Sequence, residues 1–321
     1  MRILVTGGAG FIASNLTPRL LGAGHEVVAV DNLQLGTRAH IRPFLGNPQY
    51  TFWKLDLLDL PKVDELFTTH KPDLVWHLAA NSDISFGTTY TDFDLKGGTL
   101  VTYNILESMR KHDVKRIVFS SSGAVYGEPL MLPTPEDYGP LWPISLYAAS
   151  KLACEALISA FCFNYDMQAW IYRFGNIVGP NPTHGVSFDF VKKLLKDPRR
   201  LEILGDGTQT KPYVYVEDCI DGMAFGFQHA QDRVNCFNLA VEDWTSVRTI
   251  AEVTVATMGL SNVEFAFTGG PRGWTGDVPK VRLDTGKLTR LGWKPRLTSD
   301  EAIVQTADAI VAQMRAGWGK G

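Results

Sequence analysis

The sequence predicts an α/β protein in which a doubly wound parallel sheet is followed by a smaller, mixed region. Apolar runs of strand length alternate with amphipathic segments of helix length over residues 1–175. The runs lack a period of two, which is typical of parallel strands covered by helices on both faces. After residue 175 the alternation loosens, and turns rich in glycine and proline become frequent. We therefore expect domains at 1–175 and 176–321, with part of 212–240 returning to the first.

Each element of the first domain follows from the local pattern of apolar residues. The expected strands, which read as buried apolar runs, are Ile3–Thr6, Glu26–Asp31, Thr51–Asp56, Leu74–Ala79, Val114–Ser120 and Ala169–Phe174. The expected helices are Ile12–Ala23, Pro61–His70 (with proline at its start), Leu100–His112 and Tyr147–Asp166. Two apolar stripes are expected to face the core: Leu100, Tyr103, Ile105 and Met109 on one helix, and Cys154, Ile158, Phe161 and Cys162 on the next.

Composition favours a soluble, cytoplasmic protein with no nucleic-acid, membrane or metal partner. The 321 residues are 45% apolar with a net charge of −3, which suits a large core and offers no basic block for nucleic acid. Met1 leads almost directly into the first strand, so no signal peptide is expected, and no apolar run approaches the roughly 18 residues of a membrane span. The cysteines lack CxxC spacing, which favours free buried thiols at Cys154, Cys162, Cys219 and Cys236.

A glycine-rich turn between the first strand and the first helix predicts a dinucleotide site. In VTGGAGFIAS, residues 5–14, Gly7, Gly10 and Ala13 stand three residues apart. Glycines allow a tight turn and a close approach to a pyrophosphate, whose charge then meets free N–H groups of the helix. Asp31 ends the second strand, where a carboxylate can accept both ribose hydroxyls of an adenosine and repel a 2′-phosphate. We therefore expect NAD in preference to NADP; the alternative is an ordinary turn and cap.

Two side chains one helical turn apart predict acid–base chemistry. Tyr147 and Lys151, in YAASK, are four residues apart and so share a helix face. The lysine is expected to stabilise the phenolate and lower the pKa of the phenol towards neutrality, which suits a proton acceptor for a sugar alcohol. The hydroxyls of SSSGAVYG, residues 120–127, end a buried strand and can bond the same substrate oxygen. The alternatives are a chance helical pair and hydroxyls that cap the next turn.

These motifs resemble those of the extended short-chain dehydrogenase/reductase family, in particular its sugar-nucleotide epimerase branch typified by UDP-glucose 4-epimerase. The matching segments run nearly the whole chain and include GGAGFIAS, VDNL at 30–33, HLAA at 77–80, SSSGAVYG, YAASK, RFGNIVGP at 173–180, GDGTQTKPYVYVED at 205–218 and RGWTGDV at 272–278. The resemblance implies a Rossmann-type domain that binds NAD and a second domain that binds a nucleotide-diphosphate sugar. It also implies a homodimer formed by the helices at 100–112 and 147–166.

Carried over by position, the resemblance implies a role for each matching residue. It makes Tyr147 the acid/base, and Lys151 the residue that bonds the nicotinamide ribose. Ser122 becomes the catalytic hydroxyl, with Ser121 as a partial substitute. The implied cofactor contacts are Gly7, Gly10, Phe11, Ile12, Asp31, Asn32, Asp56, Leu57, Leu78, Ala79, Ala80, Ser120, Tyr147 and Lys151. The implied substrate contacts are Asp83, Ser122, Asn176, Lys211 and Arg272. Asp56 and Asp83 could instead cap their own turns.

The strand end at residues 120–124 lacks the acids of the dehydratase branch. In dehydratases this segment resembles TDEVYG, whose two acids eliminate water next to a keto group, and Gly123 and Ala124 occupy those positions here. The resemblance therefore implies an NAD-dependent epimerase that acts at C4 through a transient 4-keto intermediate, of the UDP-glucose/UDP-galactose or UDP-uronate type. Two alternatives remain: a nucleotide-sugar dehydrogenase or reductase with net redox on a GDP- or CDP-linked sugar, and a non-catalytic NAD-binding sensor or scaffold.

Overall fold

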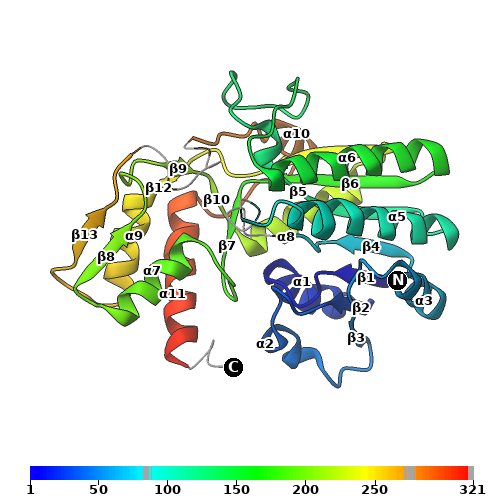
Figure 1. Ribbon diagram of the computed structural model, residues 1–321, viewed down its shortest axis with the longest axis horizontal. Helices are drawn as coiled ribbons and strands as arrows, with labels where there is room; N and C mark the ends of the chain where they lie inside the picture. Colours follow the sequence, from blue (N-terminus) through cyan, green and yellow to red (C-terminus); the bar gives the residue numbers. More distant parts are fainter. Residues whose placement is uncertain (82–86, 88, 271–272, 274–277, 279, 317–321) are drawn as a thin grey trace. The chain divides into compact units, whose positions relative to one another are not determined.

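The computed structural model describes residues 1–81, 87, 89–270, 273, 278 and 280–316 (Figure 1). The chain forms two compact units: residues 1–127, 140–173 and 223–237 make the first, and residues 128–139, 174–222 and 238–321 make the second. The division differs from the boundary expected at residue 175. The segment 128–139 joins the second unit because Thr134 forms a β-bridge with Leu283 and Glu136 accepts a hydrogen bond from the Asn238 amide.

A seven-stranded sheet forms the centre of the first unit, in the order β11-β6-β5-β4-β1-β2-β3. Its strands are β1 (Arg2–Thr6), β2 (Glu26–Asp31), β3 (Tyr50–Lys54), β4 (Leu74–His77), β5 (Arg116–Ser122), β6 (Gln168–Phe174) and β11 (Val234–Leu239). The pairs β1–β2, β1–β4, β2–β3 and β4–β5 are parallel. The order reverses at β1, which has β2 on one side and β4 on the other. In such sheets this switch point opens a crevice at the carboxyl ends of the strands, where ligands bind.

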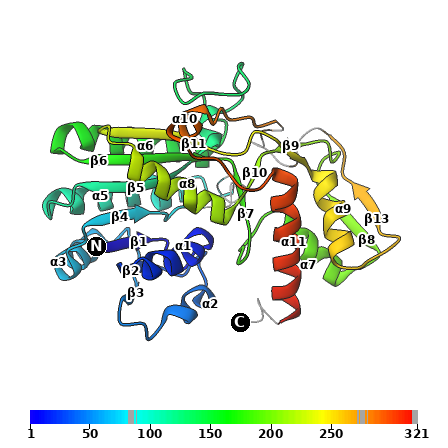
Figure 2. The ribbon, with the colours of Figure 1, turned by 180° about the vertical axis from the view of Figure 1, so that it is seen from behind.

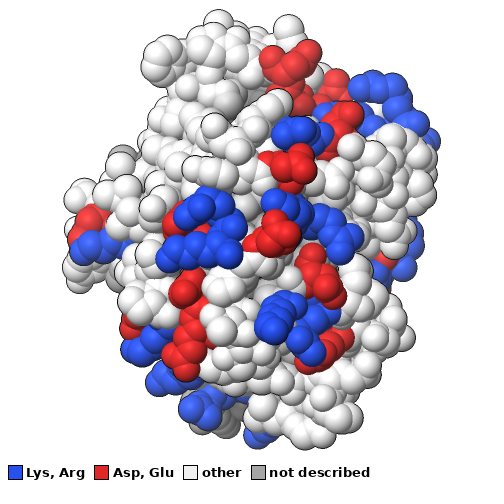
Figure 3. All heavy atoms as spheres, turned by 90° about the vertical axis from the view of Figure 1, so that its right-hand side faces the viewer, with Lys and Arg blue, Asp and Glu red and all other residues white. Residues whose placement is uncertain are grey.

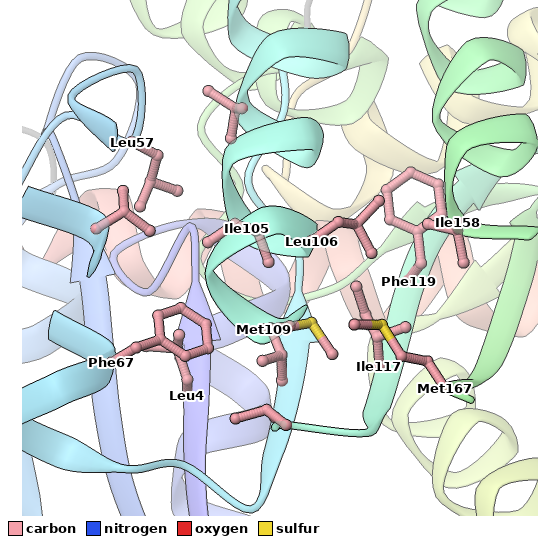
Figure 4. Packing of buried hydrophobic residues seen from close by; sticks show 14 of the residues in the cluster. Leu4, Leu57, Phe67, Ile105, Leu106, Met109, Ile117, Phe119, Ile158 and Met167 are labelled. Carbon is pink, nitrogen blue, oxygen red and sulfur yellow. The ribbon is translucent and has the colours of Figure 1, made fainter. Parts of the chain in front are cut away.

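Helices flank this sheet. They are α1 (Phe11–Gly22), α2 (Arg38–Ile41), α3 (Leu60–His70), α5 (Val101–Lys111), α6 (Leu146–Tyr165) and α8 (Val216–His229), with short turns at η1 (Arg42–Phe44), η2 (Leu95–Leu100, a π-helix) and η3 (Gly123–Tyr126). α5 packs between α3 and α6. Figure 4 shows the core beneath these helices, in which Ile105, Leu106 and Met109 of α5 lie between Phe67 of α3 and Phe119 of β5. Burial of each such side chain stabilises the fold by about 1.5–3 kcal/mol.

The expected core-facing stripe of α5 is only partly correct. Ile105 and Met109 are buried, but Leu100 is 43% exposed and Tyr103 is 42% exposed. The prediction failed because Tyr103 and Ile105 are only two residues apart in α5, so their side chains lie on different faces of the helix. Leu100 ends the π-helix three residues before Tyr103, and both side chains point outward.

α6 is long and apolar enough to cross a membrane by length and composition alone. It packs against α5, η2, η3 and β5, and it carries Lys151 and Glu155 as buried charged residues. Of the apolar 18-residue window in this helix, 39% is buried inside the protein.

The second unit contains short sheets covered by helices. Its elements are β7 (Asn176–Val178), α7 (Val186–Lys196), β8 (Arg200–Ile203), β9 (Thr210–Lys211), β10 (Tyr213–Tyr215), β12 (Thr245–Ser246), α9 (Val247–Thr257), β13 (Glu264–Phe267), α10 (Gly286–Leu291) and α11 (Ser299–Arg315), several of them visible in Figure 2. β7 pairs with β10 and β8 with β13 in parallel, whereas β9 pairs with β12 antiparallel. Phe190, Leu201, Ile250 and Ile303 anchor its core. α11 starts with a capping box between Thr298 and Glu301.

Charged side chains of both signs are intermixed on the face drawn in Figure 3. This pattern agrees with the small net charge of −3. On that face, Lys and Arg do not merge into one continuous basic surface.

Candidate active site

The turn after β1 has the shape of a phosphate cradle. Gly7 has a φ of +65°, and a Cβ added there would lie 2.9 Å from the Ala79 amide nitrogen, so only glycine fits. α1 then begins with Gly10 as its N-cap residue, and no side chain caps the helix. The N–H groups of the first turn, including those of Phe11 and Ile12, therefore point at the site where an anion would bind. The cradle fits the pyrophosphate of NAD.

Asp31 lies beside this cradle at the end of β2. Its Oδ2 accepts a hydrogen bond from the Ala9 amide at 3.1 Å, and its Oδ1 accepts one from the Leu33 amide at 2.7 Å. Burial raises the pKa of this carboxyl, and the two amides oppose the effect. A Cβ on Gly36 would lie 2.8 Å from Oδ2, so the chain passes close to the carboxylate. Each oxygen retains a lone pair, which fits the pair of hydroxyls on an adenosine ribose.

Three further expected cofactor residues lie near the ends of β2 and β3. Asn32 accepts a hydrogen bond from the Gln34 amide, and Asp56 accepts one from the Leu58 amide. Asp56 therefore does cap its own turn, as the alternative held, and its contact with adenine stays a prediction. Leu57 is 5% exposed and belongs to the hydrophobic core, so only its main chain is available to a ligand.

A hydrogen-bond network fixes the main chain after β4, where Leu78, Ala79 and Ala80 follow His77. The amides of Leu78 and Ala79 each donate to Thr6 Oγ1 at 3.1 Å. Because both lone pairs of that hydroxyl are then occupied, its hydrogen is donated to His77 Nδ1 at 2.6 Å. Burial lowers the pKa of His77 to about 3, so the ring is neutral and carries its proton on Nε2.

The other nitrogen of His77 continues this network into the helices. Nε2 donates to Thr102 Oγ1 at 3.0 Å, and the Thr102 hydroxyl donates to Cys154 Sγ at 3.1 Å. The network thus links β1, β4, α5 and α6. The imidazole orients the strand end and has no free nitrogen for acid–base work.

Ser122, Tyr147 and Lys151 are brought together in the first unit. Ser122 ends β5, and Tyr147 and Lys151 lie on the first turns of α6, which is capped by the Ser145 hydroxyl. The Ser122 hydroxyl is hydrogen-bonded to that of Tyr147, and it accepts a bond from the Ala124 amide at 3.2 Å. Lys151 Nζ donates to the Ser120 carbonyl at 2.6 Å and lies 5.9 Å from the centre of the Tyr147 ring.

The expected effect of Lys151 on the Tyr147 pKa is not what the structure shows. Burial raises the pKa of Tyr147 to about 12, the hydrogen bond from Ser122 opposes the rise, and the charge of Asp94 adds to it. Lys151 does not offset this rise because its ammonium is directed at the Ser120 carbonyl. Burial also lowers the pKa of Lys151 to about 8. Burial is therefore the largest cause of the pKa shift at both groups.

Ser121 is not a substitute for Ser122. It is 2% exposed and donates its hydrogen to Glu155 Oε1 at 2.5 Å. Successive residues of a strand point to opposite faces, so Ser121 faces away from the side of β5 occupied by Ser120 and Ser122. Glu155 was missed by the sequence reasoning, although its spacing of four residues from Lys151 placed it on the same helix face.

The expected substrate contacts fall in three places. Asn176 begins β7 and donates its amide to the Pro212 carbonyl at 3.0 Å, which places it next to Lys211 of β9 within the second unit. Asp83 and Arg272 lie outside the described residues. Contact of these residues with substrate remains a prediction.

Small residues without acidic side chains occupy the positions that hold acids in dehydratases. Gly123 and Val125 are buried in η3, and Ala124 uses its amide to bond Ser122. Neither Gly123 nor Ala124 has a group that can transfer a proton. Elimination of water by acids at these positions is therefore excluded.

Comparison with known proteins agrees with this arrangement. Residues 3–240 match the model of the NAD dependent epimerase/dehydratase family. A UDP-glucose 4-epimerase of Mycolicibacterium smegmatis is 33% identical over 96% of this chain and 98% of its own length. UDP-arabinose 4-epimerase 1 of Arabidopsis thaliana is 31% identical over 99% of this chain and 81% of its own.

A solved structure gives the same result for the fold. The Thermus thermophilus UDP-glucose 4-epimerase in complex with NAD superposes with a TM-score of 0.85 and 31% identity, over 97% of this chain and 99% of that one. The glycine cradle, the acidic end of β2 and the Ser–Tyr–Lys set are thus found in a chain of the matching family. This chain belongs to the NAD-dependent epimerase/dehydratase family.

Proposed function

We propose that this protein inverts C4 of a UDP-linked sugar. The observation that carries the proposal is the Ser122–Tyr147–Lys151 set at a strand end whose next two residues, Gly123 and Ala124, offer no acid. Such a set supports reversible oxidation of an alcohol but not elimination. The relatives named above act on UDP-sugars, which supports a UDP-sugar as substrate.

Tyr147, Ser122 and Lys151 each have a separate role in the proton transfer. Tyr147 acts in its ionised form: the phenolate accepts the proton of the C4 alcohol and becomes the phenol, which returns the proton when the ketone is reduced. Ser122 donates a hydrogen bond to the same oxygen and stabilises the charge that develops on it. Lys151 keeps a positive charge beside both groups and, by the family pattern, bonds the ribose of the cofactor. Bound NAD would supply reversible removal and return of the C4 hydrogen.

One incubation tests the proposal. The purified protein is mixed with UDP-, GDP- and CDP-sugars, and products are separated and weighed by mass spectrometry. We expect an isomer of equal mass from a UDP-sugar, with no NADH released in proportion to product. Stoichiometric NADH would instead indicate a net dehydrogenase, and NAD binding without any turnover would indicate a sensor or scaffold.

We also propose that the protein is a homodimer in a reducing, cytoplasmic environment. Exposed apolar side chains at the end of η2 and on α5 and α6 support the dimer: Leu100, Tyr103, Phe163 and Tyr165 are 42–67% exposed, and the Tyr103 and Phe161 rings are 6.4 Å apart. The free thiols of all four cysteines support the compartment. Analytical ultracentrifugation tests this interface. We expect the wild type to sediment as a dimer and Tyr103→Glu to sediment as a monomer.

A further inference from the structure

A buried ion pair lies directly behind the strand end that carries Ser122. Arg173 of β6 and Glu155 of α6 are each 7% exposed. Arg173 Nη2 donates to Glu155 Oε2 at 2.7 Å, and Arg173 Nε donates to Glu155 Oε1 at 3.0 Å. This two-point geometry holds the carboxylate in one orientation.

The pair contacts the chain on both sides of Ser122. Before it, Ser121 donates to Glu155 Oε1 at 2.5 Å. After it, Arg173 Nη1 donates to the Tyr126 hydroxyl at 2.9 Å, and the guanidinium carbon lies 4.8 Å from the centre of that ring. Tyr126 is the last residue of η3, the turn that begins at Gly123. The two flanks of Ser122 are therefore fixed to the two members of one ion pair.

The pair also connects this turn to the helix that carries the other two catalytic residues. Glu155 is four residues after Lys151 and eight after Tyr147, so all three lie along one face of α6. The ion pair therefore joins α6 to β5 and η3 on both sides of Ser122. The carboxylate oxygens of Glu155 accept hydrogen bonds from both Arg173 and Ser121.

Stability alone does not explain such a pair. Replacing a buried ion pair by apolar residues of similar volume is often neutral or stabilising, because the two charges lose their hydration. We propose that Glu155 and Arg173 are positioning residues, which hold Ser122 within hydrogen-bond distance of Tyr147. This inference rests on the proposed function for its kinetic consequence, while its geometric consequence is independent of it.

The test uses the double substitution Glu155→Leu/Arg173→Met, because a single change would leave one charge buried without its partner and could prevent folding. Tyr172→Phe is the matched control. Tyr172 precedes Arg173 in β6, and the substitution removes the buried hydrogen bond of 2.7 Å from the Tyr172 hydroxyl to the Met223 carbonyl. Three quantities are measured on the full-length protein: kcat and KM for the sugar identified above, and hydrogen–deuterium exchange of residues 120–127.

We expect the double variant to fold, to bind NAD and to keep KM within about threefold, while kcat falls about 10–100-fold, the loss that misplacement of a reacting group by about 1 Å produces. Exchange of residues 123–127 should accelerate in the double variant and stay unchanged in Tyr172→Phe. Unchanged kcat and exchange in the double variant would overturn the proposal, as would an equal loss of kcat in the control. If no sugar is turned over by the wild type, the proposed function fails, and the exchange data still decide whether the pair positions Ser122.

Discussion

The close approach at Gly7 makes a quantitative prediction for Gly7→Ala. Alanine would have to adopt the left-handed conformation at a φ of +65°, which costs about 1–2 kcal/mol for a residue with a Cβ. Its Cβ would also lie 2.9 Å from the Ala79 amide nitrogen and 3.0 Å from the Leu78 carbonyl carbon, both of them backbone atoms that cannot swing away. Displacing a packed backbone adds about 1–3 kcal/mol.

Gly24 offers a matched control for the conformational part of this cost. It has a φ of +76°, and a Cβ added there would meet nothing within 4 Å. Gly24→Ala should therefore lose about 1–2 kcal/mol of unfolding free energy and retain NAD. Gly7→Ala should lose about 2–5 kcal/mol, the sum of the two costs, and also lose the cofactor.

Denaturant unfolding gives the two free energies, and the ratio of absorbance at 260 and 280 nm of the purified variants gives their NAD content. The reasoning about the cradle is wrong if the two variants are equally stable and bind NAD equally well. In that case the close approach between the turn and β4 has no energetic consequence.

Three other predictions follow from the site. Tyr147→Phe should reduce kcat by about 10²–10⁴-fold and leave NAD content unchanged, since it removes only the acid–base hydroxyl; turnover within tenfold of wild type would contradict the assignment. Asp31→Asn should weaken NAD binding as measured by titration calorimetry. It should also reduce the ratio of the affinity for NAD to the affinity for NADP, because the negative charge that repels a 2′-phosphate is gone. An unchanged ratio of the two affinities would contradict the role of Asp31. Burial lowers the pKa of Lys151 from its ordinary 10.5 in the unfolded chain to about 8 in the folded protein. Between pH 8 and pH 10.5 the unfolded state therefore binds more protons than the folded state. The contribution of Lys151 to the free energy of unfolding consequently rises with pH over this range. The difference in unfolding free energy between wild type and Lys151→Met should therefore grow by about 3 kcal/mol from pH 8 to pH 10.5, and a flat difference would show that Lys151 is not desolvated.

Much of the first unit could be predicted because its strands are buried on both faces. The expected strand Glu26–Asp31 matches β2, and the helix expected at Tyr147–Asp166 differs from α6 by one residue at each end. Such runs must be apolar whatever surrounds them, so the pattern is visible without knowledge of contacts. The same holds for the cradle, where Gly7 is required by its own backbone angle.

Features that depend on contacts distant in sequence were not predictable in this way. The π-helix at 95–100 packs against α6, where a Cβ on Gly98 would lie 2.2 Å from the Ser150 hydroxyl, 52 residues away.

The pKa of Tyr147 likewise depends on what encloses the residue. Spacing on a helix shows that Lys151 is near, but it does not show that the ammonium bonds the Ser120 carbonyl instead of the phenol. The pairing of Arg173 with Glu155 is of the same kind, because it joins β6 to α6 and follows from the order of strands in the sheet.

The central claim is that Ser122, Tyr147 and Lys151 support removal and return of the same hydrogen at C4, with no elimination. Incubation of the wild type with UDP-glucose in D₂O, followed by proton NMR of the product, tests it directly. We expect a C4-inverted sugar that retains its original hydrogen at C4 and incorporates no deuterium into the ring. Deuterium at a ring carbon, or loss of water from the sugar, would contradict the account.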